Sequence, residues 1–242
     1  MADSNKILAI IPARGGSKRL PGKNIRQLDG RPLIAYSILA AKSTLLIDDV
    51  VVASDSLDIS QAANQYHAVH NYLDPKLTID AATLVGSLKE TVLAYGDIIA
   101  TPEWIVLLQP TCPLRQPSLI NKWIQEVLNK PNCDGGLTVD KSGFKLGYCD
   151  LSGFYTPDYI PMTSKASGSR HWGRENGLFY MFKAENVLNG KPFGKRMIPL
   201  ENPPIQSLAN IDTQLDWDVT EYLFHAKGYK GMFDTLEMDL NG

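Results

Sequence analysis

Short apolar runs alternate with amphipathic stretches along most of this chain, and this alternation limits the possible folds more than any other feature. Strands are expected in the apolar runs at residues 7–13, 48–55, 67–70, 104–110, 135–140, 177–182 and 196–200. Helices are expected between them at residues 32–43, 56–66, 80–96, 118–130, 184–188 and 213–228. Near-continuous apolar strands separated by helices are typical of a parallel sheet with helices on both faces. The sequence therefore predicts a three-layer α/β fold with a mostly parallel sheet.

The alternation breaks between residues 141 and 176, where Gly, Ser, Tyr and Lys are frequent and no helical period is present. We expect this segment to be an arm inserted into one core, which is formed by residues 1–140 and 177–242. Its aromatic residues include Phe144, Tyr148, Phe154, Tyr155 and Tyr159. Because a large exposed apolar area usually marks an interface, we expect a homodimer that uses the arm.

Composition excludes several classes of partner. The net charge of −2 gives no electrostatic reason to expect nucleic acid or an anionic membrane surface. No run approaches the roughly 20 apolar residues of a membrane span. Cys112, Cys133 and Cys149 form no C-x-x-C pair, so the spacing of a zinc site or redox pair is missing. Their odd, sparse count favours reduced thiols. We therefore expect a cytoplasmic protein that binds small molecules.

The segment after the first expected strand combines glycine with positive charge. It reads Ala13-Arg14-Gly15-Gly16-Ser17-Lys18-Arg19-Leu20-Pro21-Gly22-Lys23-Asn24. Ligands in open α/β sheets bind at the carboxyl ends of strands, and glycines let backbone amides approach an anion closely. The segment matches neither the Walker A pattern nor G-x-G-x-x-G. A solvated basic loop is the alternative, but the position after the first strand favours a triphosphate-binding loop.

This loop resembles the N-terminal motif of the acylneuraminate cytidylyltransferases, the CMP-sialic acid synthetase family. The resemblance continues through residues 31–38, 51–55, 107–115, 174–180 and 210–216. It implies a Rossmann-like nucleotidyltransferase fold, with CTP and a nine-carbon 2-keto sugar acid as substrates. The implied reaction transfers CMP to the sugar acid and releases pyrophosphate, with Mg²⁺ as cofactor.

The resemblance also assigns roles within the basic loop. The implied nucleotide-binding residues are Ala13, Arg14, Gly15, Gly16, Ser17, Lys18, Lys23 and Asn24. Lys23 is expected to stabilise charge on the α-phosphoryl group, because phosphoryl transfer depends on positioned cations. The implied catalytic residues are Lys23, Arg14 and Asp212.

A second set of residues is implied to contact the sugar acid. Its members are Gln109, Thr111, Arg170, Arg174 and Asn176. The segment Gln109-Pro110-Thr111-Cys112-Pro113 has a simpler interpretation as a rigid loop with a buried thiol at Cys112. Arg115 is expected either to pair with an anion or to form a surface salt bridge. An arginine at 170 or 174 suits a bidentate contact with a carboxylate.

The implied metal ligands are Asp212 and Asn210. The family usually has two aspartates here, whereas Asn210 brings an amide oxygen without charge. Asp212 could instead be only a helix N-cap. A further departure is that no arginine lies between Arg31 and Arg115, where many members place one near the nucleotide.

Three alternatives to the implied activity remain open. A Kdo-type cytidylyltransferase is one, although such enzymes typically carry an acidic loop where this chain has residues 109–113. A nucleotidyltransferase with another base or sugar is the second. A non-catalytic nucleotide-binding relative is the third, and release of pyrophosphate from CTP would distinguish it from an enzyme.

Overall fold

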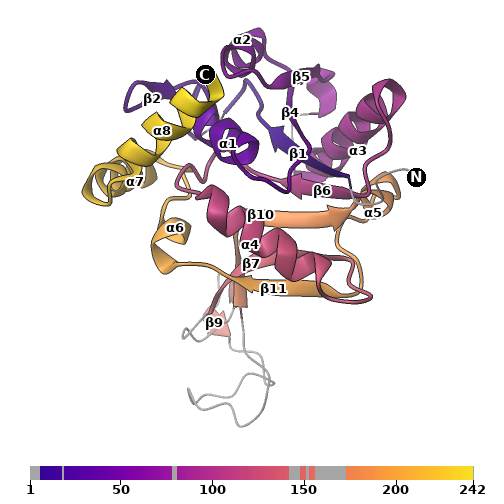
Figure 1. Ribbon diagram of the computed structural model, residues 1–242. Coiled ribbons are helices and arrows are strands. Elements are labelled where there is room, and N and C mark those ends of the chain that lie inside the picture. The colour runs from indigo at the N-terminus through magenta and orange to yellow at the C-terminus, as the bar shows by residue number, and fades with distance from the viewer. Residues whose placement is uncertain are drawn as a thin grey trace.

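The computed structural model describes residues 6–17, 19–77, 81–141, 148–150, 153–155 and 173–241. A seven-stranded sheet in the order β11-β7-β10-β6-β1-β4-β5 forms its centre, from β5 at the top of Figure 1 to β11 near the bottom. The strands are β1 Ile7–Pro12, β4 Asp49–Ser54, β5 Val69–Tyr72, β6 Trp104–Leu107, β7 Gly135–Lys141, β10 Gly173–Lys183 and β11 Met197–Glu201. All described neighbours pair in parallel except β10, which is antiparallel to both β6 and β7. The expected mostly parallel sheet is confirmed.

Helices cover both faces of the sheet, so the expected three layers are confirmed. In β1, Ile7, Ala9 and Ile11 face one apolar cluster, and Leu8 and Ile10 face another. The first cluster includes residues of α1 Leu33–Lys42, α2 Leu57–Gln65, α4 Pro117–Leu128, α7 Gln214–Ala226 and α8 Tyr229–Asn241. The second includes residues of α3 Ala81–Ile98 and α5 Ala184–Leu188. This alternation along β1 is what a strand buried on both faces requires.

Several predicted element ends are wrong; the expected strand at 104–110, for example, ends at Leu107. Strand β5 begins at Val69 rather than 67, because His67 has φ +54 and the Ala68 amide donates to the carbonyl of Ala63. This turn ends α2, so the chain becomes extended only from Val69 onward. Helix α3 does not stop at Gly96 but continues to Ile98.

Several elements were not expected from the sequence. They are β2 Gln27–Leu28, β3 Arg31–Pro32, a 3-10 turn Pro75–Leu77, β8 Tyr148–Asp150, β9 Gly153–Tyr155, α6 Pro204–Leu208 and α8. Strand β10 also begins at Gly173, four residues before the predicted core segment. The remaining residues of the expected arm, 142–147, 151–152 and 156–172, lie outside the described residues, so the arm stays a prediction.

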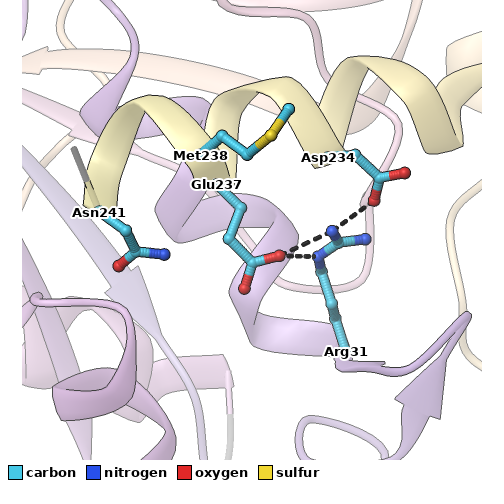
Figure 2. Close-up of a pocket in the computed structure, with 5 residues that line it drawn as sticks. All are labelled: Arg31, Asp234, Glu237, Met238 and Asn241. Atoms are coloured by element: carbon cyan, nitrogen blue, oxygen red, sulfur yellow. Dashed lines mark hydrogen bonds and ion pairs between the residues drawn. The ribbon is translucent and has the colours of Figure 1, made fainter.

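The β2–β3 hairpin is tied to the C-terminal helix by charge. Its turn contains Asp29 at φ 47 and Gly30 at φ 83, and Lys230 lies 2.6 Å from the Asp29 carboxylate. Arg31 donates to Asp234 at 2.5 Å and to Glu237 at 2.7 Å (Figure 2). The hollow beside these pairs has a volume of about 520 Å³ and is lined by Arg31, Asp234, Glu237, Met238 and Asn241.

None of the helices in the described ranges is both long enough and apolar enough to cross a membrane.

Candidate active site

The basic loop starts where β1 ends and packs against the end of β4. The Ala13 amide donates to the carbonyl of Ala53 at 2.9 Å, which extends the pairing of the two strands. Two residues further along, the Gly15 amide donates to Asp55 Oδ1 at 2.8 Å. A Cβ on Gly15 would lie 2.9 Å from the Cβ of Ser56, so this close approach requires glycine. The contact with Asp55 was not expected from the sequence.

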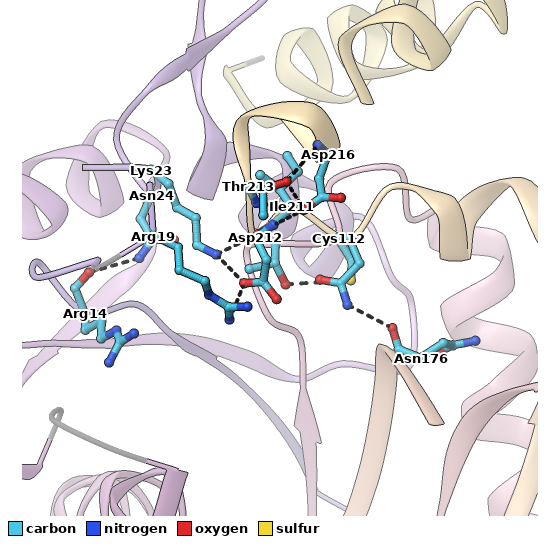
Figure 3. Close-up of polar contacts among 12 residues, drawn as sticks. Arg14, Arg19, Lys23, Asn24, Cys112, Asn176, Ile211, Asp212, Thr213 and Asp216 are labelled. Carbon is cyan, nitrogen blue, oxygen red and sulfur yellow. Dashed lines mark hydrogen bonds and ion pairs between the residues drawn. The ribbon is translucent and has the colours of Figure 1, made fainter. Parts of the chain in front are cut away.

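The rest of the loop folds back on itself. Asn24 is buried, and its side-chain amide donates to the carbonyl of Arg14 at 3.0 Å (Figure 3). Asn24 therefore holds the loop together. Gly16 is exposed, whereas Arg14 and Ser17 are half-buried. Lys18 lies outside the described residues, so its predicted phosphate contact stays a prediction.

Lys23 reaches from this loop to the segment before α7. Its ammonium donates to the carbonyl of Ile211 at 2.6 Å and to Asp212 Oδ1 at 3.0 Å (Figure 3). The same carboxylate oxygen lies 3.1 Å from a guanidinium nitrogen of Arg19. Two cations of the loop thus converge on the carboxylate predicted to bind metal.

A capping box at the start of α7 fixes the backbone of Asp212. Thr213 is the N-cap, and Asp216 accepts hydrogen bonds from the amides of Asp212 at 3.0 Å and Thr213 at 2.7 Å. Burial raises the pKa of Asp216, but these hydrogen bonds outweigh it, so the pKa lies below its ordinary value. The alternative that Asp212 is the N-cap is therefore wrong, because Thr213 caps the helix and leaves the Asp212 side chain to face Lys23.

The donor set around Asp212 suits a magnesium ion that is completed by phosphate oxygens. Mg²⁺ is usually bound through one or two carboxylates plus substrate phosphates, with several waters retained. Asp212 supplies one carboxylate, and the Asn210 side chain lies nearby with its amide nitrogen 3.4 Å from the carbonyl oxygen of Asn176. No group of three or more His, Cys, Asp or Glu residues that could hold a metal occurs in the described ranges. The residues present therefore fit a substrate-borne Mg²⁺ and not a site built from protein carboxylates alone.

Three segments meet around Gly177, which has φ +77. A Cβ on Gly177 would lie 3.3 Å from the amide nitrogen of Asn210 and 4.0 Å from Gln109 Oε1. The carbonyl of Thr111 accepts a hydrogen bond from the Ile211 amide at 2.8 Å. The loop after β6 thus lies beside the segment that carries Asp212, so Gln109 and Thr111 are placed next to the end of the basic loop.

Asn176 has a structural role that the sequence did not reveal. It is buried, and its side-chain oxygen accepts from the Thr138 hydroxyl at 2.6 Å and from the Leu178 amide at 3.2 Å. Its side-chain nitrogen donates to Asp140 at 3.0 Å and to Asn202 at 2.6 Å. These four contacts join β7, β10 and the segment after β11, so the predicted sugar contact would have to share an amide that is already hydrogen-bonded.

Arg174 is exposed and lies 3.4 Å from Asp140. Burial raises the pKa of Asp140, but hydrogen bonds, first from Asn176 and also from Arg174, hold it below its ordinary value. The other arginine predicted to meet the sugar acid, Arg170, lies outside the described residues.

Arg115 and Cys112 lie beneath the loop after β6, and both are fully buried. Burial raises the pKa of the Cys112 thiol, which suits an inert packing residue and not a nucleophile. The expected surface salt bridge of Arg115 is wrong, because the side chain is fully buried and its acceptors among the described residues are two backbone carbonyls and the Ser37 hydroxyl. The pairing of Arg115 with an anion stays a prediction.

Comparisons with known proteins agree with this arrangement. Residues 8–153 match a family model described as Cytidylyltransferase. CMP-N,N'-diacetyllegionaminic acid synthase of Legionella pneumophila is 32% identical over 224 residues, which are 90% of this chain and 96% of that protein. N-acylneuraminate cytidylyltransferase of Escherichia coli is 29% identical over 88% of this chain, which spans only 51% of that longer protein.

A similar fold occurs in a solved structure of CMP:2-keto-3-deoxy-manno-octonic acid synthetase complexed with CTP. The TM-score is 0.67, and the match covers 92% of this chain and 100% of the other. Sequence identity is 17%, so this similarity supports a shared fold alone.

Proposed function

The chain belongs to the cytidylyltransferase family and is a nucleotidyltransferase, and on this premise we propose that it transfers CMP from CTP to a nonulosonic 2-keto sugar acid. The observation that carries the proposal is the meeting of Lys23 and Asp212, 3.0 Å apart, where the basic loop ends beside the loop after β6. Cations for a triphosphate and polar side chains for a sugar acid are thereby placed side by side. The similarity to the Legionella synthase over nearly its whole length supports a sialic-acid-like acceptor.

In the proposed reaction, the anomeric hydroxyl oxygen of the sugar acid bonds to the α-phosphorus of CTP, and the hydroxyl proton is released to solvent. The bond from that phosphorus to the bridging oxygen breaks, and pyrophosphate leaves with the electron pair. Negative charge develops on the α-phosphoryl oxygens and on the leaving group, so fixed cations lower the barrier. Lys23 and Arg14 are the loop residues that we propose for this work, with Lys23 at the α-phosphoryl group.

Mg²⁺ is part of the proposal as cofactor. Asp212 and the side-chain oxygen of Asn210 would hold it together with phosphate oxygens of CTP. When bound, it would neutralise charge on the triphosphate. Because Asn210 is neutral, Asp212 carries the protein's charge contribution to this ion.

The order of strands divides the site into two halves. The basic loop follows β1 and contacts Asp55 after β4, so we place the nucleotide over the β1 and β4 ends. Gln109 and Gly177 lie on the other side, just after the end of β6 and within the neighbouring strand β10. Amide and hydroxyl groups gather there, and these suit a polyhydroxylated acid. We propose that the acceptor binds in this half.

The alternative acceptor is Kdo, since the solved synthetase for that sugar shares the fold. The loop at residues 109–113 contains no acidic residue, which favours the nonulosonic acid over Kdo. A homodimer and a cytoplasmic location also belong to the proposal, and sedimentation at micromolar concentration would test the dimer.

The test crosses four nucleoside triphosphates with a panel of sugar acids and measures Mg²⁺-dependent release of pyrophosphate. The panel contains N-acetylneuraminate, a legionaminate, a pseudaminate and Kdo. We expect release with CTP and with at least one nonulosonic acid. Release with Kdo alone would support the alternative, whereas CTP binding without any release would indicate a non-catalytic protein.

A further inference from the structure

The ladder between β6 and β10 ends at a defined rung. Antiparallel pairing runs from Trp104 opposite Lys183 to Leu107 opposite Tyr180. Continued in the same register, the strands would bring Leu108 opposite Phe179 and then Gln109 opposite Leu178, because each step forward on one strand is a step back on the other. The structure pairs no residues there.

The guanidinium of Arg115 occupies this place in the ladder. Its Nη2 donates to the carbonyl of Gln109 at 2.5 Å, and its Nε donates to the carbonyl of Leu178. These two carbonyls belong to the residues that the continued register would pair. One side chain therefore bridges the two strands where their backbones no longer pair.

A closed set of hydrogen bonds holds the Gln109 peptide in one orientation. Arg115 Nη1 donates to the Ser37 hydroxyl at 2.9 Å, and that hydroxyl lies 3.4 Å from the carbonyl oxygen of Gln109. The Cys112 amide lies 3.3 Å from the same carbonyl oxygen. Three donors thus turn this carbonyl toward the protein interior, while the Gln109 side chain lies by Gly177.

Burying a guanidinium costs solvation free energy that burying an apolar side chain does not. Arg115 is 0% exposed, and the acceptors recorded for it in the described part of the chain are two carbonyls and a hydroxyl, with no carboxylate among them. Well-packed apolar residues often replace buried charges without loss of stability. Its planar fork, however, can bind carbonyls on two strands at once.

We propose that Arg115 is a positioning residue for the acceptor sugar acid. By bridging the carbonyls of Gln109 and Leu178, two steps beyond the last paired residues, it fixes the chain after β6 against β10 and holds the Gln109 side chain beside Gly177. It acts through Gln109 and the turn at Gly177 and does not touch the substrate. This inference rests on the proposed function, since the acceptor half of the site is defined there.

The test measures KM for the sugar acid and KM for CTP separately in Arg115→Lys. Lysine keeps the charge but cannot bridge both carbonyls with a planar fork. We expect KM for the acid to rise about tenfold or more, the effect of losing a hydrogen bond to a charged group, while KM for CTP changes less than about twofold. Amide hydrogen exchange should become faster in peptides that cover 108–112 and 177–180.

The matched control is Arg31→Lys, which alters another largely buried arginine in the same way. Arg31 is 9% exposed and binds Asp234 and Glu237 on α8. We expect this variant to lose stability without separating the two KM values. If Arg115→Lys does not fold, Ser37→Ala removes only the bridging hydroxyl and should raise KM for the acid about threefold, again with KM for CTP unchanged.

Equal changes in both KM values, or no change in either, would overturn the inference while leaving the proposed function intact. A wild-type protein that turns over no sugar acid with CTP would overturn the proposed function, and the inference with it. Faster exchange at 108–112 with unchanged KM for the acid would reduce Arg115 to a structural role and also contradict the proposal.

Discussion

Lys23 Nζ lies 3.0 Å from Asp212 Oδ1, although 189 residues separate the two along the chain. The lysine comes from the basic loop after β1 and the aspartate from the start of α7. Any cation that binds this carboxylate oxygen must share it with Lys23 or displace the lysine. The predicted phosphate ligand and the predicted metal ligand are thus parts of one contact.

Lys23→Ala should lower kcat by a factor on the order of 10² or more, because it removes a fixed cation from the transition state. The fold should persist, because Arg19 still pairs with Asp212. Steady-state kinetics measure kcat, and thermal melting tests whether the variant is folded. Lys122→Ala, at a lysine that is 62% exposed on α4, is the control and should leave kcat unchanged. A near-wild-type kcat in folded Lys23→Ala would remove this lysine from the catalytic role.

Asp212→Asn should nearly abolish activity, because the Mg²⁺ site would then have only neutral protein ligands. Asn210→Asp should lower the Mg²⁺ concentration at half-maximal rate, because it adds a second carboxylate. The measurement is a Mg²⁺ titration of initial rate at saturating CTP. If Asp212→Asn keeps both its rate and its midpoint, the metal binds elsewhere, and Asp55 is the next carboxylate to test.

Asp216→Ala should lower the free energy of unfolding by about 1 kcal/mol at pH 7, because it removes half of the capping box. The pKa of Asp216 is lowered in the folded protein, so its contribution is present above the unfolded value of about 3.9 and is lost as pH falls through the folded value. The difference in the free energy of unfolding between wild type and Asp216→Ala should therefore become smaller toward pH 3. Urea unfolding at both pH values measures it. Asp218→Ala on the same helix is the control. A difference in the free energy of unfolding that stays constant with pH would contradict the role of Asp216 in the capping box.

Cys112 should resist alkylation in the native protein, because its thiol is buried and burial raises its pKa. Mass spectrometry after N-ethylmaleimide treatment should find Cys112 unlabelled until the protein is unfolded. Cys112→Ser should keep kcat within about threefold, because the proposed reaction has no step at sulfur. Rapid native labelling of Cys112 accompanied by loss of activity would contradict this.

Apolar periodicity predicted the sheet and most of the helices that pack on it. In β1 each residue from 7 to 11 packs into one of two apolar cores, and a run of this kind is compatible with few other folds. The missed hairpin at Gln27–Pro32 had a signal, the Asp29-Gly30 pair, whose two positive φ values are typical of a tight turn between antiparallel strands. Helix α8 was missed because only Tyr229 and Phe233 among its residues are buried, so its apolar period is weak.

For the candidate site, the sequence indicated residue types but not the contacts between them. Glycines and cations in order after a strand indicated the basic loop, but no local pattern could place Lys23 against Asp212. Arg115 was misinterpreted because arginine is rarely fully buried, and its partners Leu178 and Ser37 lie 63 and 78 residues away. Long-range contacts of this kind become visible only when the chain is folded.

Transfer of the α-phosphate tests the proposed activity most directly. The wild-type protein is incubated with Mg²⁺, N-acetylneuraminate or a legionaminate, and CTP that is radiolabelled at either the α- or the γ-phosphate. We predict that the α-label appears in a product containing both CMP and the sugar acid, and that the γ-label appears only in pyrophosphate. Retention of both labels in CTP, or release of the γ-label as inorganic phosphate, would contradict the proposed function.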